Sequence, residues 1–279
     1  MTTVSAFVIS YNVEDYIGNC LQSLSWCDEI VVVDVSSTDG SAEIARQYTE
    51  KVFVRPFAPI VELTREFAYE QTTGDWVITL DADEIVDADM ILWIKQFILE
   101  DKYDGAALLR KNYIFGKWSP YTRYWPDNVL RLFRRGKVKF LPVIHTNPVI
   151  ESGKIYKQKK DDIGRIHHFN QVNLFQYIEK MNRYTEVEST GAKPKNPLTV
   201  LFYVLYIFTK EYIRNQAYRE GMYGFCVHAI TAVYYLVREL KVWEASRNLD
   251  VPAHYQNVAG QIISHIKQNQ KNGRVKNNG

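Results

Sequence analysis

The chain has 279 residues, a formal net charge of only +2 and 46% hydrophobic residues. That length is enough for one large α/β domain, or for a domain of ordinary size with a substantial appendage. The small net charge excludes a strong overall field for nucleic acid, and three scattered cysteines form neither a disulfide framework nor a zinc pattern, which suits a reducing cytosol. Strand-like sequence begins at Val4 with no basic segment before it, so we expect no signal peptide.

Short apolar runs alternate with amphipathic runs over the first 80 residues. The apolar runs are typical of buried strands, and the amphipathic runs have the spacing of helices. We expect strands at residues 4–10, 29–33, 52–54 and 76–80, with helices at 14–25, near 41, and at 61–73. Such alternation predicts right-handed βαβ units and a mainly parallel sheet.

Three carboxylates, Asp81, Asp83 and Glu84, crowd the end of the fourth predicted strand. Buried carboxylates are costly and resist joint ionisation, whereas Mg²⁺ or Mn²⁺ prefers such hard oxygens. The alternative is an acidic helix start, in which the same carboxylates lie at the positive end of a following helix. Asn12 and Asp34 also follow predicted strands, and ligands of parallel sheets bind outside the carboxyl ends of the strands. We therefore expect these side chains to meet at one rim, which favours the metal site.

No glycine-rich phosphate loop follows the first predicted strand, and the chain contains no Gly-Lys-Ser/Thr sequence. A nucleotide bound at this rim must therefore rely on side chains and a metal for its phosphates. Beyond residue 100 the alternation becomes irregular, with strand-like pieces at residues 105–110, 113–116 and 129–134.

The C-terminal third changes character. A polar amphipathic helix is expected at residues 173–188, and aromatic and aliphatic stretches follow at 198–208 and 225–240. A bilayer span takes roughly 20 apolar residues, so the first stretch is too short, and charged residues interrupt the second. Their aromatic content and basic flanks favour helices that lie on an anionic membrane surface, whereas the alternative is a hairpin packed on the chain or across a homo-oligomer. Residues 268–279 are rich in Asn, Lys and Gly and are predicted to be disordered.

Four short motifs in the first 85 residues resemble, in their order, family 2 glycosyltransferases of the GT-A fold. They are Ser10-Tyr11-Asn12, Val31-Val32-Val33-Asp34 with Ser37-Thr38-Asp39-Gly40, Arg65 before Gly74-Asp75-Trp76, and Leu80-Asp81-Ala82-Asp83-Glu84. The later segment 125–133 and His145 are similar to the bacterial subgroup that includes lipopolysaccharide core β-glucosyltransferases. That subgroup commonly has an acidic residue directly after the histidine, whereas this chain has Thr146, so the identity of the catalytic base stays open.

The resemblance implies a UDP-sugar donor, inversion at the anomeric carbon and a bound Mg²⁺ or Mn²⁺. It assigns Tyr11 to stacking on uracil, Asp34 to accepting a hydrogen bond from its N3–H, and Asn12 to the same nucleotide site. Further roles go to Arg65 near the base or diphosphate, Asp81 near the ribose or the metal, and Asp83 on the metal. Arg131 is a candidate contact for the diphosphate or the acceptor, since arginine binds phosphate oxygens in a fork, although it could equally form a surface ion pair.

Inversion by a single displacement needs a base for the acceptor hydroxyl. Asp127, His145 and Glu151 are the available groups, and we favour Asp127. Each has a simpler interpretation: Asp127 as a turn residue after Pro126, His145 as a core histidine or a third metal ligand, and Glu151 as a solvated charge.

Taken together, the sequence predicts an α/β protein with a GT-A, Rossmann-like, mainly parallel sheet and a C-terminal helical extension. We place a nucleotide-sugar-binding catalytic domain at residues 1–170 and a membrane-associating or oligomerising helical region at 171–279. The expected activity is transfer of a hexose, such as glucose, from a UDP-sugar to a lipid-linked envelope saccharide such as lipopolysaccharide core. The expected location is cytoplasmic, peripheral on the inner face of the cytoplasmic membrane.

Two alternative functions stay open at this point. A transferase of the same fold could act on a peptide or protein, and would not need membrane contact. A sugar-phosphate nucleotidyltransferase also joins a Rossmann-like sheet to a metal-binding acidic pair. That class usually carries a Gly-rich basic loop after its first strand, which Tyr11-Asn12-Val13-Glu14 lacks.

Overall fold

The computed structural model describes residues 2–57, 62–140, 148–150, 153–171, 173–247 and 250–276. Its contacts divide the chain into two compact units. The first, here called the sheet unit, comprises Met1–Tyr177 and Glu211–Val227, and the second, the helical unit, comprises Ile178–Lys210 and His228–Gly279. Residues 211–227 thus return to the sheet unit, a connection that the sequence-based division at residue 170 does not include.

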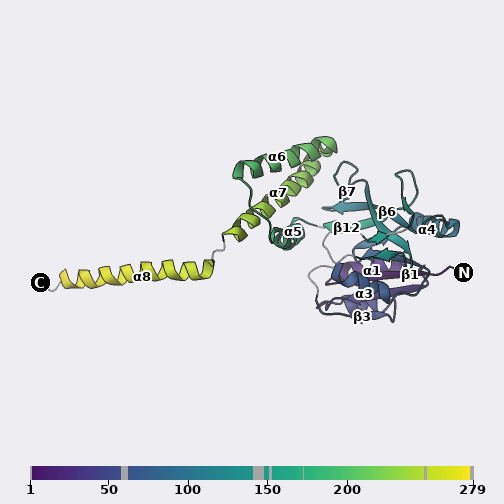
Figure 1. The fold of residues 1–279 in the computed structure, drawn as a ribbon, viewed down its shortest axis with the longest axis horizontal. Helices are drawn as coiled ribbons and strands as arrows, with labels where there is room; N and C mark the ends of the chain where they lie inside the picture. The colour runs from purple at the N-terminus through teal and green to yellow at the C-terminus, as the bar shows by residue number, and fades with distance from the viewer. Residues whose placement is uncertain are drawn as a thin grey trace. The chain divides into compact units, whose positions relative to one another are not determined.

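The N-terminal half of the sheet is parallel and has the strand order β3-β2-β1-β4. These strands are β1 (Val4–Ser10), β2 (Glu29–Asp34), β3 (Val52–Val54) and β4 (Trp76–Asp81), and the helices between them are α1 (Glu14–Ser23), α2 (Ser41–Ala45) and α3 (Glu62–Glu70). They are coloured purple to blue in Figure 1. Each element lies where the sequence predicts it, which confirms the βαβ interpretation.

Two apolar cores cover the two faces of this sheet. On one face, Val8 of β1 packs in a cluster with Ile17 of α1 and with Ile94 of α4 (Ala88–Glu100). On the other face, Phe7 of β1 packs in a second cluster with Ala68 of α3. Because side chains alternate across a strand, β1 is apolar on both faces and therefore lies in the buried centre of the sheet.

The second half of the sheet is mixed. β8 (Asp127–Arg134) is antiparallel to β4, β6 (Gly105–Ile114) is antiparallel to β8, β12 (Ile166–Gln171) is parallel to β6, and β5 (Glu84–Val86) is antiparallel to β12. The short strands β7 (Lys117–Trp118) and β11 (Ile155–Lys157) pair with β6, and β9 (Val138–Lys139) pairs with β10 (Val149–Ile150). The strand piece predicted at 105–110 and the first two residues of the piece predicted at 113–116 form the single strand β6, whereas Phe115 and Gly116 form the turn after it.

The turn after β4 settles the alternative interpretation of its carboxylates. Glu84 begins strand β5, and the next helix, α4, starts only at Ala88. Asp87 is its N-cap and accepts a hydrogen bond from the backbone N–H of Met90 at 2.8 Å. The acidic-helix-start interpretation is therefore wrong, because the capping role belongs to Asp87.

The C-terminal part is helical, as predicted. It contains α5 (Leu174–Ser189), α6 (Pro197–Arg214), the 3₁₀ helix η1 (Ala217–Glu220), α7 (Gly221–Ser246) and α8 (Val251–Lys276). The prediction of a disordered tail is wrong for residues 268–276, which continue α8. In the part of the chain that the structure describes, no helix combines the length and the apolar character needed to cross a bilayer.

Candidate active site

The end of β2 is held by a dense set of hydrogen bonds around Asp34. This carboxylate is almost completely buried, and it accepts hydrogen bonds from the Ser10 hydroxyl at 3.0 Å, the Ser37 backbone N–H at 2.8 Å and the Ser37 hydroxyl at 2.5 Å. A carboxylate has about four acceptor positions, so about one remains for a ligand. The network fixes the loop between β2 and α2.

The neighbouring end of β1 is tied to the same loop. Asn12 has a φ of 49°, and its Oδ1 accepts a hydrogen bond from the Thr38 backbone N–H at 2.8 Å. Its own backbone N–H donates to the Ser37 hydroxyl at 2.9 Å. Tyr11 is exposed, and its ring lies 4.8 Å from that of Phe57 in a tilted arrangement. The structure thus brings the predicted nucleotide residues of β1 and β2 together.

A cluster of buried charges lies at the end of β4. From β8, Nη2 of Arg131 contacts Asp81 and donates to Glu84 Oε1 at 2.8 Å; from β6, Nη1 of Arg110 donates to the same Oε1 at 2.7 Å. Glu84 is wholly buried, and its Oε2 accepts the backbone N–H of Asp81 at 2.9 Å. Since buried ions are stable only when paired, this cluster fixes the turn that carries Asp81 and Asp83.

The same charges fix the ionisation of Asp81. Burial alone would raise the pKa of this carboxyl, but the guanidiniums of Arg131, Arg65 and Arg110 lower it by more, so its pKa lies far below the usual range. Arg65, on α3, places Nη2 3.6 Å from Asp81 Oδ1. Burial would lower the pKa of Arg131, but Asp81 and Glu84 raise it. Asp81 is therefore an anion and Arg131 a cation at neutral pH, and Arg131 is committed to carboxylates of the protein.

Asp127 lies beside this cluster as the first residue of β8, so its interpretation as a turn residue is wrong. Its Oδ2 accepts hydrogen bonds from Arg110 Nε and from Asn112 Nδ2, each at 2.8 Å. About a quarter of the side chain remains exposed. Asp127 is thus a fixed carboxylate that solvent, or a substrate hydroxyl, can reach.

Asn112 connects Asp127 to a buried histidine. Its Oδ1 lies 2.7 Å from His168 Nδ1 on β12, and His168 Nε2 lies 3.4 Å from Asp83 Oδ1. Arg110, Asn112 and His168 were not predicted from the sequence as site residues. The consecutive pair His167-His168 was the only available signal for the last of these, and nothing local shows which ring faces the site.

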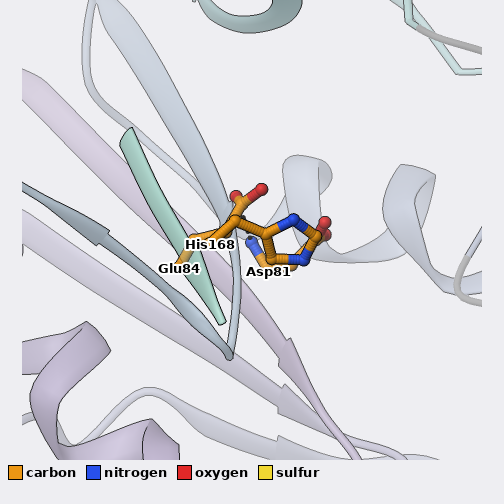
Figure 2. Close-up of side chains that lie close together, drawn as sticks. All are labelled: Asp81, Glu84 and His168. Carbon is orange, nitrogen blue, oxygen red and sulfur yellow. Dashed lines mark hydrogen bonds between the residues drawn. The ribbon is translucent and has the colours of Figure 1, made fainter. Parts of the chain in front are cut away.

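The oxygen and nitrogen atoms of this region could hold a cation. Ligand atoms of Asp81, Glu84 and His168 all lie within 4.8 Å of one another, and Figure 2 shows these three side chains gathered together. Both oxygens of Glu84 already accept hydrogen bonds, however, and the side chain is wholly buried. Asp83 keeps 22% of its side-chain exposure and faces His168 Nε2. We therefore regard Asp83 and His168, with Asp81 beside them, as the set that best fits a divalent metal.

The residues of this site lie within a segment that matches a known protein family. A model described as glycosyl transferase family 2 matches residues 5–181, which include the strand ends, the buried charges, Asp127 and His168. The chain belongs to glycosyltransferase family 2. It is accordingly an enzyme of the transferase class, and the nucleotidyltransferase alternative is set aside.

Relatives of this family 2 glycosyltransferase match most of its length. The lipopolysaccharide core biosynthesis glycosyltransferase LpsC of Rhizobium meliloti is 29% identical over 259 residues, covering 86% of this chain and 92% of that protein. An uncharacterized glycosyltransferase of Rickettsia typhi is 25% identical over 292 residues, covering 97% and 98%. Among solved structures, S. aureus TarS 1–349 in complex with UDP is similar with 17% identity and a TM-score of 0.44, covering 88% of this chain and 91% of that one.

Two of the three candidate bases of the glycosyltransferase, His145 and Glu151, lie outside the described residues. The other histidine of β12, His167, belongs to a different set of contacts. Its Nε2 lies 3.1 Å from Asp87 Oδ2 and its Nδ1 lies 3.0 Å from the Tyr113 hydroxyl. These contacts tie β12 to the start of α4 and do not involve the charge cluster.

Proposed function

We propose that this chain is an inverting, divalent-metal-dependent glycosyltransferase that moves a hexose from a UDP-sugar to a cell-envelope saccharide. The observation that carries this proposal is the connection between Asp127 and the Asp83–His168 pair through Asn112. The group that takes the acceptor proton and the cation that stabilises the leaving diphosphate are then held at one reaction centre. The name of the Rhizobium meliloti relative supports lipopolysaccharide core as the class of acceptor.

At the donor end, Tyr11 and Phe57 offer a ring surface for the uracil base. Asp34 has about one acceptor position left for the N3–H of uracil, a donor that cytosine and adenine do not offer at that edge. Asn12 holds the loop that carries these contacts, and Arg65 lies beside Asp81 where the ribose and diphosphate would approach.

At the reacting centre, Asp83 and His168 would hold the divalent cation, with Asp81 next to them. A bound cation supplies charge that stabilises the leaving diphosphate. Asp127 takes the proton of the acceptor hydroxyl, whose oxygen bonds to the anomeric carbon as the bond to the diphosphate breaks. Arg110 and Asn112 hold the Asp127 carboxylate in place for this step. UDP leaves with the electron pair of the broken bond.

A panel of sugar nucleotides tests the proposal directly. Purified protein is mixed with UDP-, GDP- and ADP-hexoses with Mn²⁺, Mg²⁺ or EDTA, and nucleotide release and thermal stability are measured. We expect release only from a UDP-sugar with a divalent cation, and thermal stabilisation by UDP, since a ligand at a hundred times its Kd adds about 2.7 kcal/mol. Asp83→Asn should abolish the nucleotide release that depends on a divalent cation, without lowering the melting temperature of the protein. Equal activity in EDTA, or preference for a purine nucleotide, would contradict the proposal.

We also propose that the enzyme meets its acceptor at an anionic membrane surface. In α6, the large apolar side chains Leu198, Leu201, Phe202, Leu205 and Tyr206 recur at helical spacing, and all are exposed. Helices with an apolar stripe and basic residues, here Lys210 and Arg214, lie in the interface of anionic bilayers.

Flotation with liposomes separates this location from oligomerisation. Intact protein should float with vesicles of phosphatidylcholine and phosphatidylglycerol, and less so at high salt. Phe202→Asp should abolish flotation, whereas Ser264→Asp, the same charge change at an exposed polar position of α8, should not. If the protein ignores these vesicles and forms a discrete oligomer that Phe202→Asp dissociates, a second subunit covers the stripe.

A further inference from the structure

One buried amide, that of Asn112, lies between the two halves of the proposed reaction centre. Its Nδ2 donates to Asp127 Oδ2 at 2.8 Å and to the backbone carbonyl of Tyr124 at 3.2 Å. Its Oδ1 lies 2.7 Å from His168 Nδ1. Asn112 is 6% exposed, so water does not replace these contacts. Both of its N–H donors, and one acceptor position of its oxygen, are therefore used within the protein.

The chemistry of these partners fixes which way the amide points. A carboxylate and a carbonyl can only accept, so the nitrogen of the amide must face Asp127 and Tyr124. The oxygen must then face His168, and an amide oxygen can only accept. His168 Nδ1 therefore carries a hydrogen, and in the neutral ring Nε2 has the lone pair.

That tautomer determines what His168 presents to Asp83. Nε2 of His168 and Oδ1 of Asp83 lie 3.4 Å apart, and both are acceptors when the ring is neutral. Two such atoms face one another favourably only with a cation between them, either a proton on the ring or a metal ion. The opposite tautomer would place a hydrogen on Nε2 and block metal binding there.

We propose that Asn112 is a positioning residue that locks His168 in its Nδ1–H tautomer with its oxygen while it orients Asp127 with its nitrogen. The proposed metal ligand and the proposed base are then set by one side chain. A rotation of this amide would break both contacts at once, so the two groups are correct together or not at all. The catalytic consequence rests on the proposed function, whereas the tautomer itself does not.

Two substitutions separate the two halves of this role. Asn112→Asp keeps an acceptor for His168 Nδ1–H but removes the donor to Asp127 and places a second negative charge beside it. Asn112→Ala removes both contacts. The matched control is Asn128→Ala on β8, which removes an amide that donates to the backbone carbonyls of Ala107 and Gln158 in the same sheet.

The first measurement uses the metal-free protein. Long-range ¹H–¹⁵N spectra, recorded well above the ordinary histidine pKa of about 6.5, report which ring nitrogen carries the hydrogen. We expect the Nδ1–H form of His168 in the natural protein, in Asn112→Asp and in Asn128→Ala, and loss of that form in Asn112→Ala. His167 serves as an internal reference because its contacts are to Asp87 and Tyr113.

The second measurement is the affinity for Mn²⁺, together with kcat and KM for a UDP-hexose. Asn112→Ala should weaken Mn²⁺ binding about 10- to 100-fold, the usual effect of losing a partner behind a ligand. Asn112→Asp should keep Mn²⁺ affinity and donor KM but lose kcat. If Asn112 had a merely structural role, the same substitution would lower Mn²⁺ affinity and kcat together. An unchanged His168 tautomer in Asn112→Ala, or equal loss of Mn²⁺ affinity in both variants, overturns the inference. A protein with the expected tautomer shift but no Mn²⁺ binding would instead contradict the proposed function.

Discussion

Among the described residues, each unit contains one buried glutamate held by two cations, and the two glutamates differ in the exposure of those cations. In the sheet unit, Glu84 is paired with Arg110 and Arg131, which keep only 16% and 6% of their side-chain exposure. In the helical unit, Glu239 is paired with Lys195 and Arg238, which keep 44% and 23%. Water can replace a lost partner in the second case but not in the first.

The two glutamates also differ in the further contacts of the cations that pair with them. The arginines that hold Glu84 extend to Asp127 and Asp81, so these five charges form one connected set that reaches the candidate active site. Glu239 instead joins α7 to the segment before α6, and its cations reach solvent. The charges around Glu84 therefore position candidate site residues, whereas the pairs of Glu239 are a local contact of the helical unit.

The largest effect should come from the exposed end of the connected set. Asp127→Asn keeps the shape of the side chain but removes its ability to take a proton. We expect kcat for sugar transfer to fall about 10²- to 10⁴-fold, the usual contribution of general base catalysis, with little change in donor KM. Steady-state kinetics with a UDP-hexose measure this, and full activity in the variant would move the role of base to one of the residues outside the described ranges.

Glu84→Gln should act mainly on stability, with a large loss of the free energy of unfolding. The buried guanidiniums of Arg110 and Arg131 would each lose an anion, and breaking a buried pair typically costs about 3–5 kcal/mol. Urea unfolding measures the difference. The exposed Glu43→Gln is the control and should change stability by less than about 0.5 kcal/mol. A loss from Glu84→Gln no larger than that of the control would show that the pairs with Arg110 and Arg131 add little to the stability of the sheet unit.

A smaller effect is expected at Glu29, at the opposite end of β2 from the site. Burial would raise the pKa of this carboxyl, but hydrogen bonds from Lys51, Ser5 and Thr73 lower it to about 2. Because the folded pKa is depressed, Glu29 stabilises the protein above about pH 4.5 and loses that contribution as the pH falls towards 2. Glu29→Gln should cost about 1.5–3 kcal/mol at pH 7. Unfolding curves of the two proteins should converge near pH 2, and a constant difference down to that pH would contradict the assignment.

The smallest effect should be that of Glu239→Gln. Lys195 and Arg238 are partly exposed, so water solvates them once the carboxylate charge is gone, and pairs of this kind are worth about 1 kcal/mol or less. Urea unfolding of Glu239→Gln and Glu84→Gln side by side gives the two losses of unfolding free energy, and the loss in Glu239→Gln should be several times smaller. If the two variants lose equal stability, partner exposure does not decide the cost of losing a buried charge in this protein.

Half of the candidate site follows from the sequence, because its residues come directly after apolar runs that can only be strands. Asp34 and Asp81 are of this kind, and the convergence of their strands is a general property of parallel sheets. Arg110 and Asn112 could not be found in this way. They lie within a ten-residue strand, and their roles depend on pairing with Asp127 and with His168, which is 56 residues further along the chain.

The wrong prediction for the C-terminal tail also has a physical origin. The tail beyond residue 267 has little apolar sequence, so composition predicts disorder, yet it continues a helix that begins at Val251 with Asp250 accepting the backbone N–H of Ala253 at 3.0 Å. A helix start signal thus lies 18 residues before the segment whose structure was predicted wrongly. Local composition does not register a start that far upstream.

The strand β12 gives the chain an unusual sensitivity to length. His167 is in register with Ile85 and Lys111, and His168 with Glu84 and Asn112, so consecutive imidazoles serve opposite faces of the sheet. Inserting one residue ahead of Ile166 with a shift of register would move His167 into the position of His168, and His168 into that of Phe169. His167, which now contacts Asp87 at the start of α4, would then point to the acidic turn, and His168 would lose its contact with Asn112. Natural sequences that keep this chemistry should therefore vary in length before β12 only where the added residues are absorbed in the loop.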